Sequence, residues 1–260
     1  TSTKMICYDV KDTLHKLDSL NVNIVVDKVF DIKQASFLID PLIRDRSLSS
    51  LVVGEIDESN PAVVITAIWN AYDTQMEKFK NDKILYKIAT DFDFPLAPLL
   101  FKMEKRGVKI NTNYLADMSH ELGKKYEELQ QKIFDIAGYK FNIASPAQLS
   151  DMLFIKLQLP TTGIKKGKTG YSTGQKELNK LRGLHPVIEL IEQTRELAKL
   201  KNTYVDALPK LVDKNYRLHT TFNQDVVSTG RLSSTHPNLQ NIPIRSTEVE
   251  IGRASCRERV

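Results

Sequence analysis

The sequence predicts a mostly helical α+β protein in which short α/β segments precede a long antiparallel helical hairpin and a few short antiparallel strands. Three observations lead to this fold class. Apolar residues recur at helical spacing through several long segments between residues 61 and 204. Capping residues and glycines mark the ends of most of these segments. Near residues 218–245, an alternating segment followed by a proline-containing polar run indicates strands and turns.

The composition fits an ordinary globular protein. A chain of 260 residues with 41% hydrophobic and 27% charged residues can bury one or two cores. No apolar run reaches the roughly 18 residues that span a bilayer, and the N-terminus lacks a signal-peptide pattern. Cys7 and Cys256 lie at opposite ends and outside any CxxC or Cys/His cluster. We therefore expect no disulfide framework, no metal site, no membrane partner and a cytoplasmic location.

The net charge of +5 is unevenly distributed along the chain. Residues 1–100 carry 11 Lys and Arg against 15 Asp and Glu, a net −4, whereas residues 101–260 carry 26 against 17, a net +9. A basic region of this size favours polyanion binding by the second part, although solvated basic helices are also common.

The first 93 residues predict an α/β arrangement. The run from Asn23 to Phe30 is typical of a buried strand, and short helices are expected around Phe37 and after Ser47. Asn60 is a predicted N-cap with Pro61 in the first helical position. The apolar period of 3.6 then continues to about Phe79.

The next segments predict a helical hairpin. An amphipathic helix over 95–106 is stopped by Gly107, and Asn111 or Thr112 caps a long helix that reaches about Ala137. A return helix over 186–204 is expected to pack antiparallel on it. Ser145 and Gln148 predict a capping box, whose free N–H groups either bind a phosphate or only complete the cap.

The connection at the far end of the hairpin is cationic. Residues 160–176 contain lysines and glycines but no acid, which predicts a flexible loop too glycine-rich to form a packed element. Ser172 and Gln175 predict a second capping box after it. Lysines on such a loop can follow a phosphate backbone without reading its sequence, and a merely solvated loop is the alternative.

The polar run near the C-terminus is the most informative stretch. It holds Arg231, Asn238, Gln240 and Asn241, and no acidic residue lies between Asp225 and Glu248. Cationic and amide donors along an extended backbone suit the minor groove of a duplex, where every base pair presents acceptors at similar positions. The run therefore predicts a surface that senses base-pair geometry without reading sequence.

The pattern Thr229-Gly-Arg-Leu-Ser-Ser followed by Pro237-Asn-Leu-Gln-Asn-Ile-Pro closely resembles the family A DNA polymerases. This resemblance implies four parts. Residues 1–93 would be the C-terminal part of a degenerate 3′–5′ exonuclease-like domain, 94–212 the thumb, and 213–248 the start of the palm. Residues 249–260 depart from the family pattern and read as a foreign tail.

The resemblance also implies which residues contact DNA. Arg231 would reach the primer-terminal pair, and the three amides of the polar run would touch the duplex and template. At the hairpin tip, the Thr-Gly-Tyr-Ser-Thr run would grip the backbone; Ala144 departs from the family Asn. The further DNA-binding residues implied in this way are Asn142, Ser145, Lys165, Lys166, Lys168, Thr169, Tyr171, Ser172, Thr173, Lys199, Lys201, Asn202 and Thr203.

The activity implied is DNA-directed DNA synthesis by a longer, monomeric parent that uses dNTPs and Mg²⁺. The resemblance places the catalytic carboxylates downstream of this chain, so no catalytic or metal residue is expected here. One alternative is a magnesium-dependent 3′–5′ exonuclease using Asp31, which matches one family carboxylate, and Asp73. We favour surface or capping roles for these two and for Asp9. The other alternative is a DNA-binding module without a catalytic parent.

Overall fold

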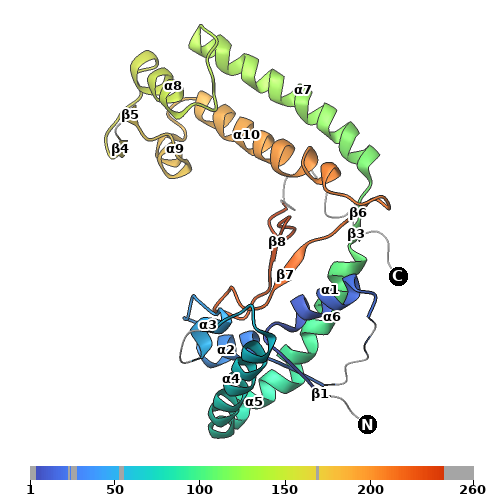
Figure 1. Ribbon diagram of the computed structural model, residues 1–260. Helices are drawn as coiled ribbons and strands as arrows, with labels where there is room; N and C mark the ends of the chain where they lie inside the picture. The colour runs from blue at the N-terminus through green and yellow to red at the C-terminus, as the bar shows by residue number, and fades with distance from the viewer. Residues whose placement is uncertain (1–3, 23, 25–27, 53–55, 168–169, 243–260) are drawn as a thin grey trace. The chain divides into compact units, whose positions relative to one another are not determined.

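The computed structural model describes residues 4–22, 24, 28–52, 56–167 and 170–242 (Figure 1). The chain forms two compact units. Unit 1 holds the residues up to Val108 together with His219–Ile242, and unit 2 holds Lys109–Leu218. Helices dominate, and the strands within the described ranges form four two-stranded sheets, which confirms the mostly helical α+β class. Among these residues, no helix combines the length and apolar character needed to cross a bilayer.

Unit 1 begins with a parallel strand pair. The register pairs Lys4 with Lys28 and Cys7 with Asp31, and the intervening helix makes the crossover that parallel strands require. Part of the predicted strand run, residues 23 and 25–27, lies outside the described residues. The elements of this part are β1 (Lys4–Cys7), α1 (Val10–Ser19), β2 (Lys28–Asp31), α2 (Ile32–Ile39) and α3 (Leu48–Leu51).

Three further helices cover this strand pair. They are α4 (Pro61–Asn81), α5 (Lys83–Ile88) and α6 (Phe94–Arg106), with a π-helical turn (Ala89–Asp93) between the last two. The Asn60 side chain accepts from the Ala62 N–H at 3.1 Å, which confirms the predicted cap. The π turn immediately precedes Pro95, whose ring would clash with a carbonyl of a regular α-helical turn. The core lies around Phe30, whose ring meets those of Tyr72 and Phe94 at 4.7 and 4.8 Å.

Unit 2 is built on a helical hairpin. The long helix α7 (Thr112–Ala137) and the return helix α10 (Val187–Leu200) lie side by side (Figure 1). Ile133 and Ala137, near the end of α7, share a core cluster with Val187 and Ile188 at the start of α10, so the two helices are antiparallel as predicted. Asn111 caps the first helix through the Tyr114 N–H, and Gly138 ends it with φ 79°.

Small elements close the tip of this hairpin. They are α8 (Pro146–Ser150), a π turn (Asp151–Lys156), β4 (Lys166–Gly167), β5 (Gly170–Tyr171) and α9 (Gln175–Leu181). After α10 the chain makes a π turn (Lys201–Val205) and a 3₁₀ turn (Leu208–Lys210). Leu149, Met152, Leu153 and Leu178 are fully buried between these elements and the two long helices.

The chain passes between the units twice, where β3 (Val108–Lys109) pairs with β6 (Arg217–Leu218). It then forms β7 (Thr221–Asn223) and β8 (Ser233–Thr235) as part of unit 1. These two strands pair antiparallel, with Phe222 opposite Ser234, as expected for this region. The predicted boundaries at residues 93/94 and 212/213 remain predictions, because they refer to domains of relatives rather than to compact units.

Candidate nucleic-acid interface

The polar strip, residues 226–242, starts in the connection between β7 and β8 and continues past β8. Gly230 turns this connection with φ 74°, a conformation that favours glycine. The Thr220 hydroxyl donates to the carbonyl oxygens of Thr235 and Pro237 at 3.1 and 2.8 Å. The 1% exposed Ser234 accepts from the Leu239 N–H at 2.9 Å. The backbone of the strip is therefore fixed by hydroxyl groups buried beneath it.

All four residues predicted to contact DNA in the strip are exposed: Arg231, Asn238, Gln240 and Asn241. Two of them also shape the loop. The Asn238 side-chain oxygen accepts from the Gln240 N–H at 3.0 Å, and the Gln240 side-chain nitrogen donates to the Leu232 carbonyl at 2.9 Å. The amides thus set the curvature of the strip, and Arg231 stands at its glycine turn.

The cationic segment at the tip of unit 2 is a hairpin, so the prediction of an unpacked loop is wrong. β4 and β5 pair antiparallel, with Lys166 opposite Tyr171. Ile164 is only 8% exposed within the core cluster, and the Tyr171 ring lies 5.1 Å from that of Phe154. These two apolar side chains anchor the flanks of the hairpin and leave Lys165 and Lys166 exposed. The predicted contacts Lys168 and Thr169 lie outside the described residues.

The prediction of a capping box at Ser172 is also wrong. Helix α9 begins at Gln175 with Gly174 in the cap position, and the Ser172 hydroxyl instead accepts from the Gly174 N–H at 3.3 Å. The Gln175 side chain donates to Asn179 and Glu192 rather than to the chain before the helix. Residues 172–174 therefore form a tight turn ahead of the helix.

The sequence interpretation missed Arg195 on α10. Its guanidinium donates to both the carbonyl and the hydroxyl of Thr173, and Thr173 is only 3% exposed. Burial lowers the pKa of Arg195, which Glu192 partly offsets. Arg195 and Thr173 line a pocket of about 410 Å³ together with Lys165, Tyr171 and Ser172. The sequence gives no sign of this role, because Arg195 belongs to no motif and its partner Thr173 lies 22 residues away.

The turn before α8 holds two more predicted contacts, Asn142 and Ser145. The Asn142 side-chain oxygen accepts from the Ala144 N–H at 2.9 Å. Ser145 accepts from the Gln148 N–H at 3.5 Å, but the Gln148 side chain returns to the Asn142 N–H at 2.7 Å rather than to that of Ser145. The predicted capping box is thus half formed, and the glutamine closes a wider turn.

The predicted contacts at the end of α10 differ in their surroundings. Lys199, Asn202 and Thr203 are exposed. Lys201 is instead half-buried and donates to the Ser119 hydroxyl and to the Asp206 carboxylate, both at 2.7 Å. Burial raises the pKa of Asp206, but the hydrogen bonds and charge of Lys201 and the Ser119 contact together outweigh it, so the net pKa is lowered. Lys201 therefore ties the end of α10 to α7, which leaves less of its charge for a partner.

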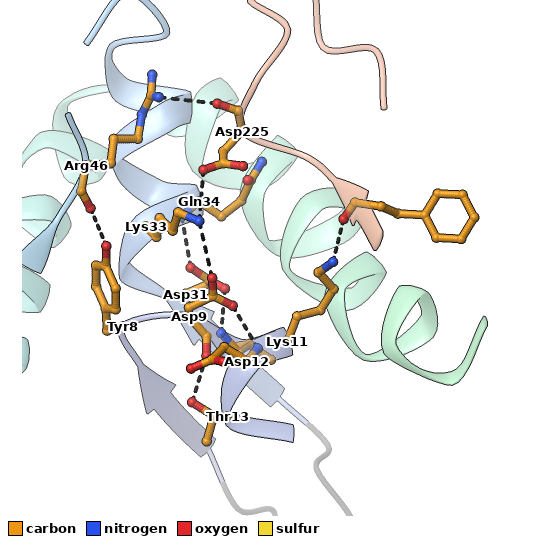
Figure 2. Close-up of polar contacts among 12 residues, drawn as sticks. Tyr8, Asp9, Lys11, Asp12, Thr13, Asp31, Lys33, Gln34, Arg46 and Asp225 are labelled. Atoms are coloured by element: carbon orange, nitrogen blue, oxygen red, sulfur yellow. Dashed lines mark hydrogen bonds and ion pairs between the residues drawn. The ribbon is translucent and has the colours of Figure 1, made fainter. Parts of the chain in front are cut away.

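The carboxylates expected in capping or surface roles are those of Asp9, Asp31 and Asp73, and the nuclease alternative uses the last two. Asp9 caps α1 and Asp31 caps α2 through the Asp12 and Gln34 N–H groups, both at 2.9 Å (Figure 2). Asp31 is 5% exposed, whereas Asp73 lies exposed on α4. No group of three or more His, Cys, Asp or Glu within the described ranges could hold a metal ion. This placement confirms the capping and surface roles and does not favour the exonuclease alternative.

Comparison with known proteins identifies the family. The model of DNA polymerase family A matches residues 112–258, more than half of the chain. The chain belongs to DNA polymerase family A. The match covers the helical hairpin and the polar strip, and it extends past Glu248, where we expected the resemblance to stop.

Individual family A relatives agree. DNA polymerase I of Synechocystis sp. is 50% identical over 163 residues, which are 62% of this chain and 16% of that protein. DNA polymerase I of Bacillus caldotenax is 42% identical over 189 residues, 72% of this chain and 21% of its own length. The polymerase domain of Pol1 from M. smegmatis, solved in complex with DNA primer-template and dNTP, superposes with a TM-score of 0.81 at 30% identity. That match covers 95% of this chain and 44% of the solved one, so the chain spans only part of these family A proteins.

Proposed function

We propose that this chain binds the primer–template duplex of a family A DNA polymerase, and that the longer protein adds dNTPs to the primer 3′ end. The observation that carries the proposal is the exposed strip of arginine and amide side chains on a hairpin with a fixed backbone. Within it, Arg231 and Gln240 are exposed, and no acidic residue occurs between Asp225 and Glu248. The relative solved with DNA primer-template supports the choice of partner.

The chemistry of the strip suits a duplex end. Purine N3 and pyrimidine O2 atoms are acceptors at similar minor-groove positions in every Watson–Crick pair. Donors that reach them register pairing geometry and ignore base identity. A polymerase requires this property, because it must accept any template and still sense a mispaired primer end.

Unit 2 would contribute phosphate contacts. Lys165, Lys166 and Lys199 are exposed, and contacts of this kind position a protein on DNA without conferring sequence preference. The Thr173 backbone held by Arg195 gives the adjacent turn a defined shape. We expect binding that is weak at physiological salt and that falls steeply as salt rises.

Magnesium belongs to the proposal only for the longer protein. Nucleotidyl transfer uses metal-bound carboxylates. The described residues offer no group of three or more His, Cys, Asp or Glu that could hold a metal ion, so they do not fit this ion. We propose a monomer that does not polymerise as this chain alone; primer extension by the purified chain would contradict that part.

The decisive experiment measures binding of labelled primer–template DNA by fluorescence anisotropy. We expect Arg231→Ala to weaken binding about tenfold, since a good groove contact contributes about 1–3 kcal/mol. Sequence preference should stay unchanged, and the preference for a paired over a mispaired primer end should fall. Arg44→Ala, which removes an exposed arginine of the same unit, is the matched control. Equal affinities of the two folded variants would refute the groove assignment.

A further inference from the structure

The open edge of β7 is occupied by side chains. Phe222 lies opposite Ser234 of β8 on one edge. Its N–H donates to the Glu104 carboxylate at 2.7 Å, and its carbonyl oxygen accepts from the Lys11 ammonium. Glu104 lies at the end of α6 and Lys11 on α1, and the two also form an ion pair. An ion pair thus takes the place that a neighbouring strand would fill.

Glu104 is buried, Lys11 is largely buried, and both oxygens of the Glu104 carboxylate have partners. Glu104 is 5% exposed, and the Lys11 side chain is 15% exposed. The second Glu104 oxygen lies 2.7 Å from the His15 Nε2 atom, and its carbonyl oxygen accepts from the His219 Nδ1–H at 2.7 Å. Removing one member of such a pair leaves a buried charge without compensation, which costs more than losing an exposed pair.

Further contacts continue along the same segment. The Gln224 side chain donates to the Asp93 carbonyl at 3.0 Å. The Asp225 carboxylate pairs with Lys33 at 3.2 Å, and its carbonyl oxygen accepts from Arg46 at 3.2 Å (Figure 2). The chain that leads into the polar strip is therefore attached at successive points to the first 93 residues of unit 1: to the π turn, to α2 and to the segment before α3.

The hairpin requires this support. β7 and β8 have three residues each, and an isolated two-stranded hairpin is at best marginally stable in water. The Arg231 turn lies directly between the two strands, so the direction of its side chain depends on how β7 is held. A contact to both the N–H and the carbonyl of one residue fixes that strand in register and in orientation.

We propose that Lys11 and Glu104 are positioning residues that hold β7 so that the polar strip can engage the primer–template end. The inference rests on the proposed function of that strip. The inference assigns to the N-terminal α/β part a role that does not depend on nuclease chemistry. This part supplies the hydrogen-bonding groups that the open edge of β7 would otherwise lack.

The test compares Lys11→Met, Glu104→Gln and Lys11→Arg with the control Lys105→Met. Lys105 follows Glu104 on the same helix and forms an exposed ion pair with Asp18, so its loss removes the same charge without touching β7. Amide hydrogen exchange of the whole chain reports on residues 219–242, with α10 as the internal reference. Anisotropy reports the affinity for paired and mispaired primer ends.

We expect Lys11→Met and Glu104→Gln to speed exchange in residues 219–242 about tenfold, which corresponds to about 1.4 kcal/mol, and to leave α10 unchanged, because each variant weakens the charge-assisted hydrogen bonds to β7. Duplex affinity should fall about tenfold, and discrimination between paired and mispaired ends should fall with it. Lys11→Arg should keep the slow exchange and the duplex affinity of the original chain, because a guanidinium can donate to the same Glu104 and Phe222 oxygens.

Other outcomes overturn the proposal. Exchange in 219–242 like that of Lys105→Met would show that the pair does not hold β7, and faster exchange across the whole chain would show a general stability role. If exchange rises locally but Arg231→Ala and the original chain bind DNA equally, the proposed function fails, while the attachment of β7 by Lys11 and Glu104 stands. If Arg231→Ala weakens binding but Lys11→Met and Glu104→Gln do not, only the positioning role fails.

Discussion

Two opposing effects act on the pKa of Asp31, and their balance can be tested. Its two carboxylate oxygens accept from the Gln34 and Val10 N–H groups at 2.9 and 2.8 Å, which favours the charged form. Burial opposes this, and together with the charge of Asp9 it raises the pKa of Asp31 from 3.8 to about 7, despite the nearby Lys33. The folded protein therefore binds a proton that the unfolded chain has already lost near neutral pH.

The sign and the size of the effect follow from linkage. The stability contributed by protonated Asp31 is fully present below about pH 4 and is lost as the pH rises through about 7. A shift of about 3 pH units corresponds to about 4 kcal/mol, at roughly 1.4 kcal/mol per unit. Asp31→Asn removes the contribution of Asp31 to the pH dependence of the free energy of unfolding. Its amide NH₂ would, however, face one of the two N–H donors, at a cost of about 1–3 kcal/mol. The original chain should be the more stable at pH 4.5 and the variant at pH 8.

Urea unfolding between pH 4.5 and 8 measures this crossing. Trp69 is the single tryptophan and lies half-exposed on α4, so its fluorescence reports on unit 1. Asp12→Asn is the matched control, since the Asp12 carboxylate is exposed on α1 and pairs with Lys16 rather than with the groups around Asp31. Parallel profiles for Asp31→Asn and the original chain would refute the reasoning. A stability difference that favours the original chain increasingly at high pH would mean that the N–H donors outweigh burial.

Two further predictions concern unit 2. Ile164→Ala should lower the free energy of unfolding by about 2–4 kcal/mol, because it opens a cavity beneath the β4–β5 hairpin. The control Ile155→Ala, at a 71% exposed position, should change it by less than about 0.5 kcal/mol. Urea unfolding followed by circular dichroism measures both. Arg195→Leu should weaken duplex binding several-fold by releasing the Thr173 carbonyl. Arg182→Leu, which breaks only the ion pair of an exposed arginine with Glu192, should not. Equal affinities of the two variants in anisotropy would contradict a role of Arg195 in shaping the Thr173 turn.

Helix limits were predictable because their determinants are local. Asn60, Asn111 and Gly138 act through N–H and carbonyl groups within four residues, and the structure places all three where the sequence predicts them. The strip was predictable only in part: its lack of acids and its arginine and amides are visible in the sequence, and Gly230 marks its turn, whereas the distant contacts that hold β7 are not.

The errors came from packing across long sequence separations. The segment 160–176 reads as a loop from its glycines, but Ile164 and Tyr171 are drawn into a core formed with α7 and α10. At Ser172, the serine and glutamine spacing was correct for a capping box, yet the helix starts at Gln175. Pairs such as Lys201 with Ser119, 82 residues apart, leave no pattern in a single sequence. Such contacts decide which predicted lysines remain available to a partner.

The division of charge along the chain also needs a structural correction. By sequence, the first hundred residues are net acidic and would repel DNA, yet the polar strip belongs to the unit that contains them. The two acids attached to the segment leading into the strip, Glu104 and Asp225, are each paired with a lysine, Lys11 and Lys33. Paired charges produce little field beyond a Debye length of about 8 Å at physiological salt. The same contacts that attach β7 and the segment after it therefore pair these two acids with lysines, which favours a cationic role for Arg231 within this unit.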